Sequence, residues 1–192
     1  MKKIITIIIL IFILQTPSQA DDIRDFQIEG MSVGDSLLDY MSIKDIKSEL
    51  ERNKGMYAYT DKKFIGVGMF KVKSELYEYI VADVKRHGDP NYKIYSIRGM
   101  FDFSNPEDCL KKQRSIVKDL SLIFKNKKKR EWDRPSAIDS TGQSKVIGVT
   151  FDFEDSGNVS VICYDYAEHI NRPSGLDVTI RNRDIQKWLE KY

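Results

Sequence analysis

The chain has 192 residues, of which 41% are hydrophobic and 31% charged, and this length and composition fit one globular domain with a sizeable core. Lys and Arg number 31 against 29 Asp and Glu, and two of the basic residues, Lys2 and Lys3, lie at the very start. The rest of the chain is therefore balanced in charge. This excludes a general nucleic-acid binder, because such a protein needs a basic excess to displace counterions from phosphate.

The first twenty residues have the pattern of a cleaved signal peptide. Lys2 and Lys3 precede an apolar run, Ile4–Leu14, and Ser18-Gln19-Ala20 places small residues at both positions that a signal peptidase reads. As a helix, this run would span only about half of a bilayer core, so no membrane span is predicted. No cysteine lies near the cleavage site, which disfavours a lipoprotein. The sequence predicts export to the periplasm, with residues 21–192 as a single domain.

Two short helices and three strands are predicted in the N-terminal half. Ser32 with Asp35, and Ser42 with Asp45, have the spacing of side chains that cap the first turn of a helix. Helices are therefore expected at 35–41 and 43–52. Stretches rich in β-branched and aromatic residues, separated by turn residues, predict antiparallel strands at 64–70, 76–85 and 92–103.

The strongest helix prediction covers residues 106–124. Ser104 or Asn105 can cap it, Pro106 lies in its first turn, and apolar residues at three- and four-residue steps form one stripe that includes Cys109. Residues 126–144 show no clear period and are predicted to be a loop. A hairpin at 146–153 and 159–166, a strand at 176–181 and a closing helix at 183–192 complete the chain.

Together these elements predict an α+β fold. An antiparallel sheet of about six strands is covered by one long helix, with short N-terminal helices and a C-terminal helix. Few connections are long enough for a parallel crossover, so the helices are expected on one face of the sheet.

The two cysteines, Cys109 and Cys163, are expected to form a disulfide. Both lie in the part of the chain predicted to be exported, where oxidising conditions preserve such bonds. A crosslink that encloses this many residues stabilises a fold by about 4 kcal/mol in the chain-entropy model. The alternative is a catalytic or redox thiol, but there is no Cys-x-x-Cys and no histidine nearby in the sequence.

Four residues are candidates for a binding surface: Trp132, Arg134, His169 and Arg172. A tryptophan beside an arginine in an exposed loop is typical of a recognition anchor, whereas a tryptophan that pins the loop to the core explains the same residue. Neither His87 nor His169 has further ligands at a suitable spacing, so no metal site is predicted.

Two charged segments have a structural explanation beside a functional one. Asp152–Val159 places oxygen donors at alternate positions, as a calcium loop does, but Cys163 stands where the bidentate glutamate would be. A hairpin turn is therefore favoured. Lys125–Arg130 can contact anionic lipid or an acidic partner, but a solvated helix end, where cations interact well with the helix dipole, is the favoured interpretation.

Three segments carry a resemblance to known proteins. Phe26–Tyr40, Tyr92–Gly99 and the helix from Cys109 through Val117 resemble an uncharacterised family of exported, periplasmic proteins from marine alphaproteobacteria. The resemblance implies export and a single domain, and it implies no catalytic residue. The Gly30-Met31-Ser32 entry into a helix is also similar to the start of small outer-membrane assembly lipoproteins of the BamE type, whose lipidated cysteine is missing here.

The sequence contains no motif of a hydrolase, a redox enzyme or a nucleotide-binding protein. We therefore expect a non-catalytic periplasmic binding or accessory protein without a cofactor, which contacts an envelope protein or a small ligand through its sheet and the segment around Trp132. An envelope-assembly factor is one alternative. The other is an enzyme whose site combines carboxylates that are distant in sequence, such as Asp102 and Asp152.

Overall fold

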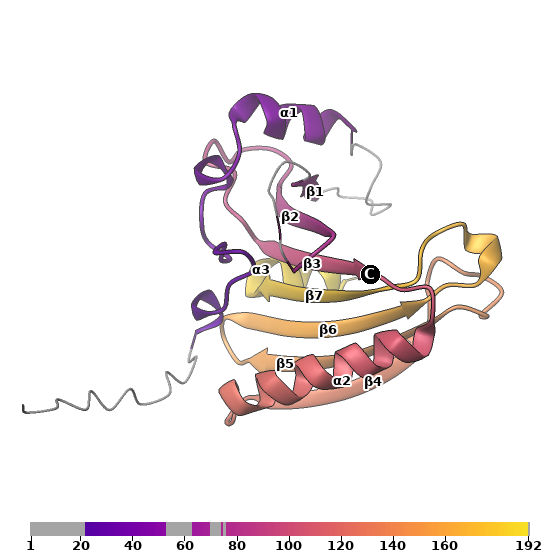
Figure 1. Ribbon diagram of the computed structural model, residues 1–192. Coiled ribbons are helices and arrows are strands. Elements are labelled where there is room, and N and C mark those ends of the chain that lie inside the picture. The colour runs from indigo at the N-terminus through magenta and orange to yellow at the C-terminus, as the bar shows by residue number, and fades with distance from the viewer. Residues whose placement is uncertain (1–21, 53–62, 70–73, 75, 192) are drawn as a thin grey trace, which may run out of the picture.

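The computed structural model describes residues 22–52, 63–69, 74 and 76–191 (Figure 1). The predicted signal peptide lies outside these residues. Within them the chain forms an α+β fold with a seven-stranded antiparallel sheet, which confirms the predicted class. The strands are β1 (Phe64–Gly68), β2 (Tyr79–Lys85), β3 (Ser96–Asp102), β4 (Lys128–Pro135), β5 (Lys145–Phe153), β6 (Gly157–Asp165) and β7 (Gly175–Asn182).

The helices are α1 (Ile43–Arg52), α2 (Pro106–Ile123) and α3 (Arg183–Leu189), with 3-10 turns at Ile23–Asp25, Leu37–Asp39 and Glu168–Ile170. One of the two predicted caps is present, since the Asp45 amide donates to Ser42 Oγ at 3.2 Å. Ser32 caps no helix, because its hydroxyl donates to the carbonyl oxygens of Arg24 and Phe26, and Ser36 caps the 3-10 turn instead. The predicted helix at 35–41 is only a 3-10 turn, whereas α1 has the predicted bounds. None of the helices in the described residues is long and apolar enough to cross a membrane.

The strand order is β1-β2-β3-β7-β6-β5-β4. The chain builds β1 to β3 as a meander, and α2 then carries it to the far edge of the sheet. From there β4, β5 and β6 return strand by strand, until β7 pairs with β3 from Ser96↔Arg181 to Asp102↔Gly175. The centre of the sheet is therefore a contact between segments far apart in the sequence.

The seventh strand, β4, corrects the predicted loop at 126–144. It pairs along its whole length with β5, and Trp132 lies opposite Gly148. Six of its eight residues are charged, so it has no apolar period from which a strand is predicted. An edge strand tolerates this composition, because its backbone pairing does not require buried side chains. Lys128–Arg130 accordingly begins a strand and is not a helix end.

Side chains alternate across the sheet, which gives it an α2 face and an α3 face. The α2 face is apolar and carries the main core, including Ile97, Phe151, Val159, Val161, Val178 and Ile180. The buried stripe of α2 and the N-terminal segment, with Ile23, Met31 and Leu37, cover this face. The closing helix α3 lies on the opposite face (Figure 1), where Ile185 and Trp188 pack on Phe64 and Tyr95. The prediction that all helices share one face is therefore wrong.

The predicted disulfide is confirmed and joins α2 to β6. Asn105 caps α2 by accepting a hydrogen bond from the Glu107 amide at 2.8 Å, with Pro106 as its first residue. This start places Cys109 on the buried side of the helix, directly over Cys163, and their Cα atoms are 6.0 Å apart. The two cysteines are 54 residues apart in the sequence, and their bond fixes α2 over the middle of the sheet.

Polar side chains fill much of the α3 face. A short helix of seven residues cannot cover a seven-stranded sheet, and long side chains of the strands themselves cover the rest. The buried polar residues on this face are Asp83, Ser96, Thr150, Asn158, Ser160, Asp177 and Thr179.

Candidate functional site

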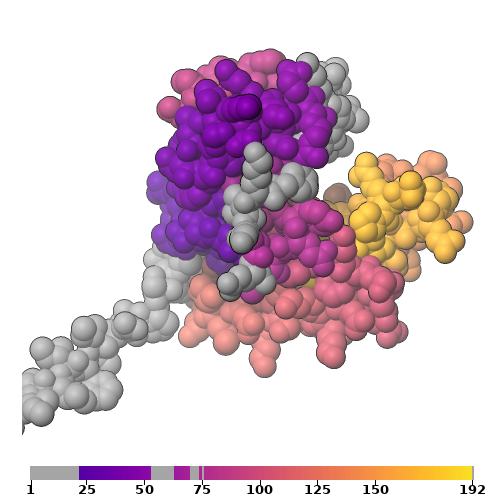
Figure 2. All heavy atoms as spheres, turned by 45° about the horizontal axis from the view of Figure 1, so that its top comes forward, coloured from indigo at the N-terminus to yellow at the C-terminus, as the bar shows by residue number. Residues whose placement is uncertain are grey.

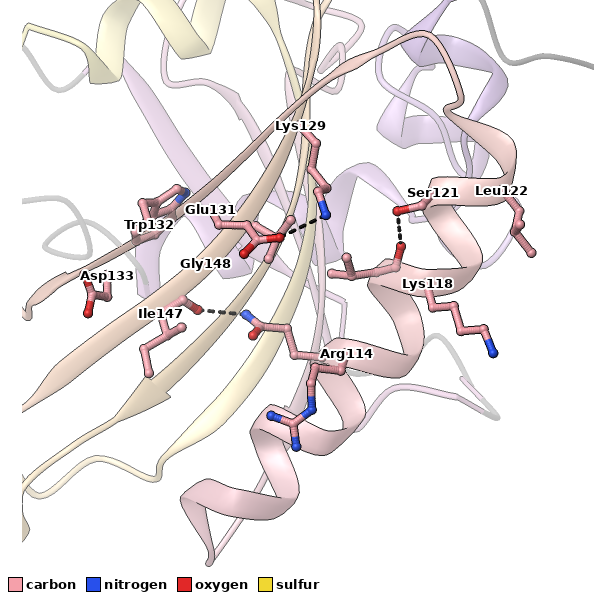
Figure 3. Close-up of a pocket in the computed structure, with 13 residues that line it drawn as sticks. Arg114, Lys118, Ser121, Leu122, Lys129, Glu131, Trp132, Asp133, Ile147 and Gly148 are labelled. Carbon is pink, nitrogen blue, oxygen red and sulfur yellow. Dashed lines mark hydrogen bonds and ion pairs between the residues drawn. The ribbon is translucent and has the colours of Figure 1, made fainter.

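A groove runs between α2 and β4 on the α2 face (Figure 3). A helix is about 10 Å wide and strands lie about 4.8 Å apart, so one helix covers about two strands. The disulfide holds α2 over β6 and β7. The outer part of β5 and all of β4 are consequently left uncovered, and the hollow has a volume of about 750 Å³.

The floor of the groove is apolar and rigidly held. It is formed by Val117 of α2 with Ile147 and Val149 of β5. Beside them the buried Gln113 side chain donates hydrogen bonds to the carbonyl oxygens of Ile147 at 2.8 Å and Val161 at 2.9 Å. Both hydrogens of its amide nitrogen are thus engaged. The spacing of helix and strands is fixed by these bonds, so the hollow exists without a ligand to hold it open.

The two walls carry different charge. Glu131 on β4 accepts from Lys129 at 2.9 Å and neutralises it, and Asp133 lies farther along the strand. On the helix wall stand Arg114 and Lys118, one turn apart and both exposed (Figure 3). Among the described residues no carboxylate lies within ion-pair distance of either cation. The rim formed by α2 is therefore positive above an apolar floor.

Trp132 and Arg134 lie on the opposite face of β4, where the indole ring lies flat over Gly148. Any side chain at position 148 would collide with this ring. The indole Nε1 donates to Thr150 Oγ1 at 3.1 Å, and the Arg134 guanidinium stacks 5.0 Å from the ring. Trp132 is half-buried. It lies in a strand and not in the predicted loop, it covers the outer margin of the α3 face, and it is also among the residues that line the groove.

His169 lies away from the groove, in a lobe formed by residues 136–144 and 166–174 at one end of the sheet (Figure 2). Its Nε2 is 3.1 Å from Oδ1 of the buried Asp139. Hydrogen bonds donated by Thr141 and Ser144 hold the pKa of Asp139 well below its usual range. The carboxylate therefore stays ionised and joins the two segments of the lobe, and His169 contributes to this clasp.

Arg172, the fourth predicted residue, lines a separate pocket of about 430 Å³ on the α3 face. Asp102 and the buried Asp177 also line it. Burial raises the pKa of Asp177 although Arg98 and Arg181 act in the opposite direction. Burial also raises the pKa of Asp102, with the neighbouring Glu78 as a further cause. Acidic and basic groups thus line the same pocket.

The proposed carboxylate pair of Asp102 and Asp152 is not formed. Both lie on the α3 face, but at different heights of the sheet. Asp102 pairs with Gly175 of β7, whereas Asp152 is level with Arg181 of β7 through its pairing with Asn158 of β6. The six residues between these two positions of β7 correspond to about 20 Å along the strand. Asp152 instead accepts hydrogen bonds from Arg130 at 2.6 and 3.0 Å. This ion pair also removes the first ligand of the calcium-like segment, which forms the predicted hairpin turn between β5 and β6.

Two acids that the fold buries within its strands, Asp83 and Asp177, were missed in the sequence. Each stands inside an apolar strand segment, Val81-Ala82-Asp83-Val84 and Leu176-Asp177-Val178. An isolated carboxylate in such a run is the signal that could have identified them, because a buried charge needs a partner. Asp83 has one in Arg98, at 3.5 Å.

Comparisons of the chain with protein-family models, curated proteins and solved structures find no match. The site is therefore interpreted from its own geometry. Among the described residues there is no group of three or more His, Cys, Asp or Glu side chains placed to hold a metal ion.

Proposed function

We propose that this protein is an exported, non-catalytic binding protein whose α2–β4 groove takes a small amphipathic anion. The observation that carries the proposal is the pairing of an apolar floor with two unneutralised cations, Arg114 and Lys118, on one rim. An alkyl or aromatic body fits the floor, and a carboxylate, sulfonate or phosphate fits the rim. The non-catalytic assignment rests on the absence of catalytic motifs in the sequence.

The expected affinity is moderate. Each methylene group that leaves water for the floor contributes about 0.8 kcal/mol, and part of this gain is offset by the immobilisation of the ligand. The cations stand at the edge of the groove, where solvent weakens their attraction for an anion. A ligand of this kind with a medium-length chain should therefore bind with a dissociation constant in the micromolar range, which suits reversible capture.

Export is supported by the leader pattern of residues 1–20 and by the disulfide, which is typical of proteins in oxidising compartments. The resemblance to exported periplasmic proteins also implies export. Mass spectrometry of the protein recovered from a periplasmic fraction tests this part of the proposal. A chain that begins at Asp21 and lacks two hydrogens is expected, whereas a full-length, reduced chain in the cytoplasm would contradict it.

Binding is tested by titration calorimetry of the mature protein with dodecanoate and with dodecyltrimethylammonium, both below their micelle concentrations. The two probes share an apolar body and differ in the sign of the head. Dodecanoate should bind at least ten times more tightly. Equal affinity for both would show that the rim cations do not select the ligand.

A matched pair of variants locates the site. Arg114→Gln with Lys118→Gln, which lowers the net charge by two, should weaken dodecanoate binding at least tenfold. Lys112→Glu makes the same kind of charge change on the far side of α2, where its ammonium lies 5.6 Å from the centre of the Phe101 ring, and should leave binding unchanged. A similar loss in both variants would mean that the anion responds only to net charge. Unchanged binding in the double variant would place the ligand elsewhere.

A further inference from the structure

The pocket on the α3 face is built differently from the groove. Its base contains Arg98 and Asp177 between Met100 and Tyr164, and its entrance is framed by exposed side chains. Within the sheet the charges of the base compensate one another, because Arg98 lies 3.5 Å from Asp83 and near Asp177. The base is thus a polar surface on which opposite charges lie close to one another.

The entrance has charges that are not compensated. Asp102 has another acid, Glu78, as its neighbour, and its own amide donates to Glu78 Oε2 at 3.2 Å. Arg172 precedes β7 on the other side, and no carboxylate of the described residues lies within ion-pair distance of it. Asp102 and Arg172 line one pocket without reaching each other. A cation is therefore lacking on one side of the entrance and an anion on the other.

Aromatic rings form the wall between these charges. Tyr164 and Tyr166 stack with their centroids 5.6 Å apart, and Tyr79 lies on the β2 side. Aromatic faces favour contact with ammonium groups and with the methylene groups beside them. Tyr164 and Asp177 contact each other below, so the wall is held in place by the base.

We infer that this pocket binds a small zwitterion of the amino-acid type, with its ammonium group at Asp102 and its carboxylate at Arg172. A zwitterion supplies both the cation that Asp102 lacks and the anion that Arg172 lacks, whereas a simple cation or anion supplies only one of them. The raised pKa of Asp102 agrees with a carboxyl group that lacks a nearby cation. The inference is independent of the proposed function, since the two sites lie on opposite faces of the sheet.

The test uses the mature protein and amide NMR titrations with a series of ω-amino acids, namely glycine, 4-aminobutanoate and 6-aminohexanoate. For each length, the amine and the carboxylic acid with only one of the two charges serve as references. At least one zwitterion should bind ten times more tightly than either of its references and shift the amides of Asp102 and Gly175. If an amine binds as tightly, the pocket is only an acidic surface, and if a carboxylic acid does, it is only a basic one. If no zwitterion shifts these amides, the inference fails.

Variants separate the two sites. Asp102→Asn should reduce the affinity of the zwitterion to that of the carboxylic acid, and Arg172→Gln should reduce it to that of the amine. Both side chains are exposed, so the fold is retained. Asp133→Asn and Arg114→Gln, which remove the same charges from the groove, should not change zwitterion binding. Conversely, the two pocket variants should bind dodecanoate normally. Loss of zwitterion binding in the groove variants, or its retention in both pocket variants, would overturn the assignment.

Discussion

The two faces of the sheet contribute differently to this protein. On the α2 face, apolar side chains of helices, strands and the N-terminal segment form one continuous core together with the disulfide. On the α3 face, a seven-residue helix packs two of its side chains, Ile185 and Trp188, on Phe64 and Tyr95, and buried serine, threonine and aspartate residues occupy much of the rest. Burying a polar group is unfavourable unless it is fully paired. The comparison indicates that the apolar α2 face provides most of the stability and thereby permits a polar α3 face.

The largest effect on stability is expected when the disulfide on the α2 face is removed. Cys109→Ala with Cys163→Ala should lower the free energy of unfolding by about 4 kcal/mol, because the unfolded chain is no longer restrained by a loop of this length. Urea unfolding followed by circular dichroism measures the loss. The wild-type protein under reducing conditions is the control and should lose a similar amount. A variant as stable as the oxidised protein would show that packing alone holds α2 in place.

The next largest effect is expected on the α3 face itself. Trp188 is 2% exposed and meets Phe64 with ring centroids 5.2 Å apart. Trp188→Ala should destabilise the protein by about 3 kcal/mol through the cavity it leaves. Hydrogen exchange should show lost protection in α3 and β1 while α2 stays protected. Equal loss of protection in α2 would show that the two faces unfold as one unit and would break the comparison.

A smaller effect is expected at the margin of the α3 face. Gly148→Ala introduces a methyl group into the space of the Trp132 ring, which must move outward and give up its hydrogen bond to Thr150. Overpacking at a half-exposed position should destabilise the fold by about 1 kcal/mol. The emission of Trp132 should shift to longer wavelength as the ring enters solvent. Val149→Ala on the other face of β5 is the control, because it removes volume without touching the indole.

The smallest effect concerns the charge buried on the α3 face. Burial raises the pKa of Asp177 above its ordinary value of 3.8. The folded state therefore holds this proton more tightly than the unfolded state, and the group costs stability increasingly as pH rises from about 4 through its pKa in the folded protein. Asp177→Asn has no such proton to lose. Relative to wild type, the variant should gain in melting temperature between pH 3 and pH 7.

The direction of this pH dependence distinguishes burial of the Asp177 carboxylate from simple loss of an ion pair. If Arg98 and Arg181 stabilised the Asp177 carboxylate more than burial penalises it, the difference between variant and wild type would change in the opposite direction with pH.

The fold was predictable where the signal is local. The period of α2, its cap at Asn105 and the alternation in β5 and β6 identify these elements, and the two cysteines on their buried sides make the disulfide evident. The strand β4 could not be predicted, because its mixed charges leave no apolar period. The position of α3 was also hidden, since Ile185 and Trp188 define an apolar side of the helix but not which face of the sheet receives it.

The candidate sites were less accessible to prediction than the fold. The groove results from the width of one helix over four strands, which no short segment encodes. Arg114 and Lys118 are ordinary surface residues of a helix until β4 is known to lie beside them. The pocket on the α3 face is lined by residues of β3, of β7 and of the loop before β7. Asp102 and Arg172 therefore come to one pocket only because of the strand order. Of the four predicted binding residues, Trp132 is among those that line the groove and Arg172 is among those that line the pocket on the α3 face.

The charged edge of the sheet has a consequence for the behaviour of the protein in concentrated solution. An unpaired strand edge can template the addition of a further strand, which leads to aggregation. Along β4, the basic residues Lys128–Arg130 are followed by Glu131 and Asp133 and then by Arg134. A second molecule that paired with this edge would have to remove water from these charges. The edge that leaves the groove open thus also protects the chain against growth into fibres.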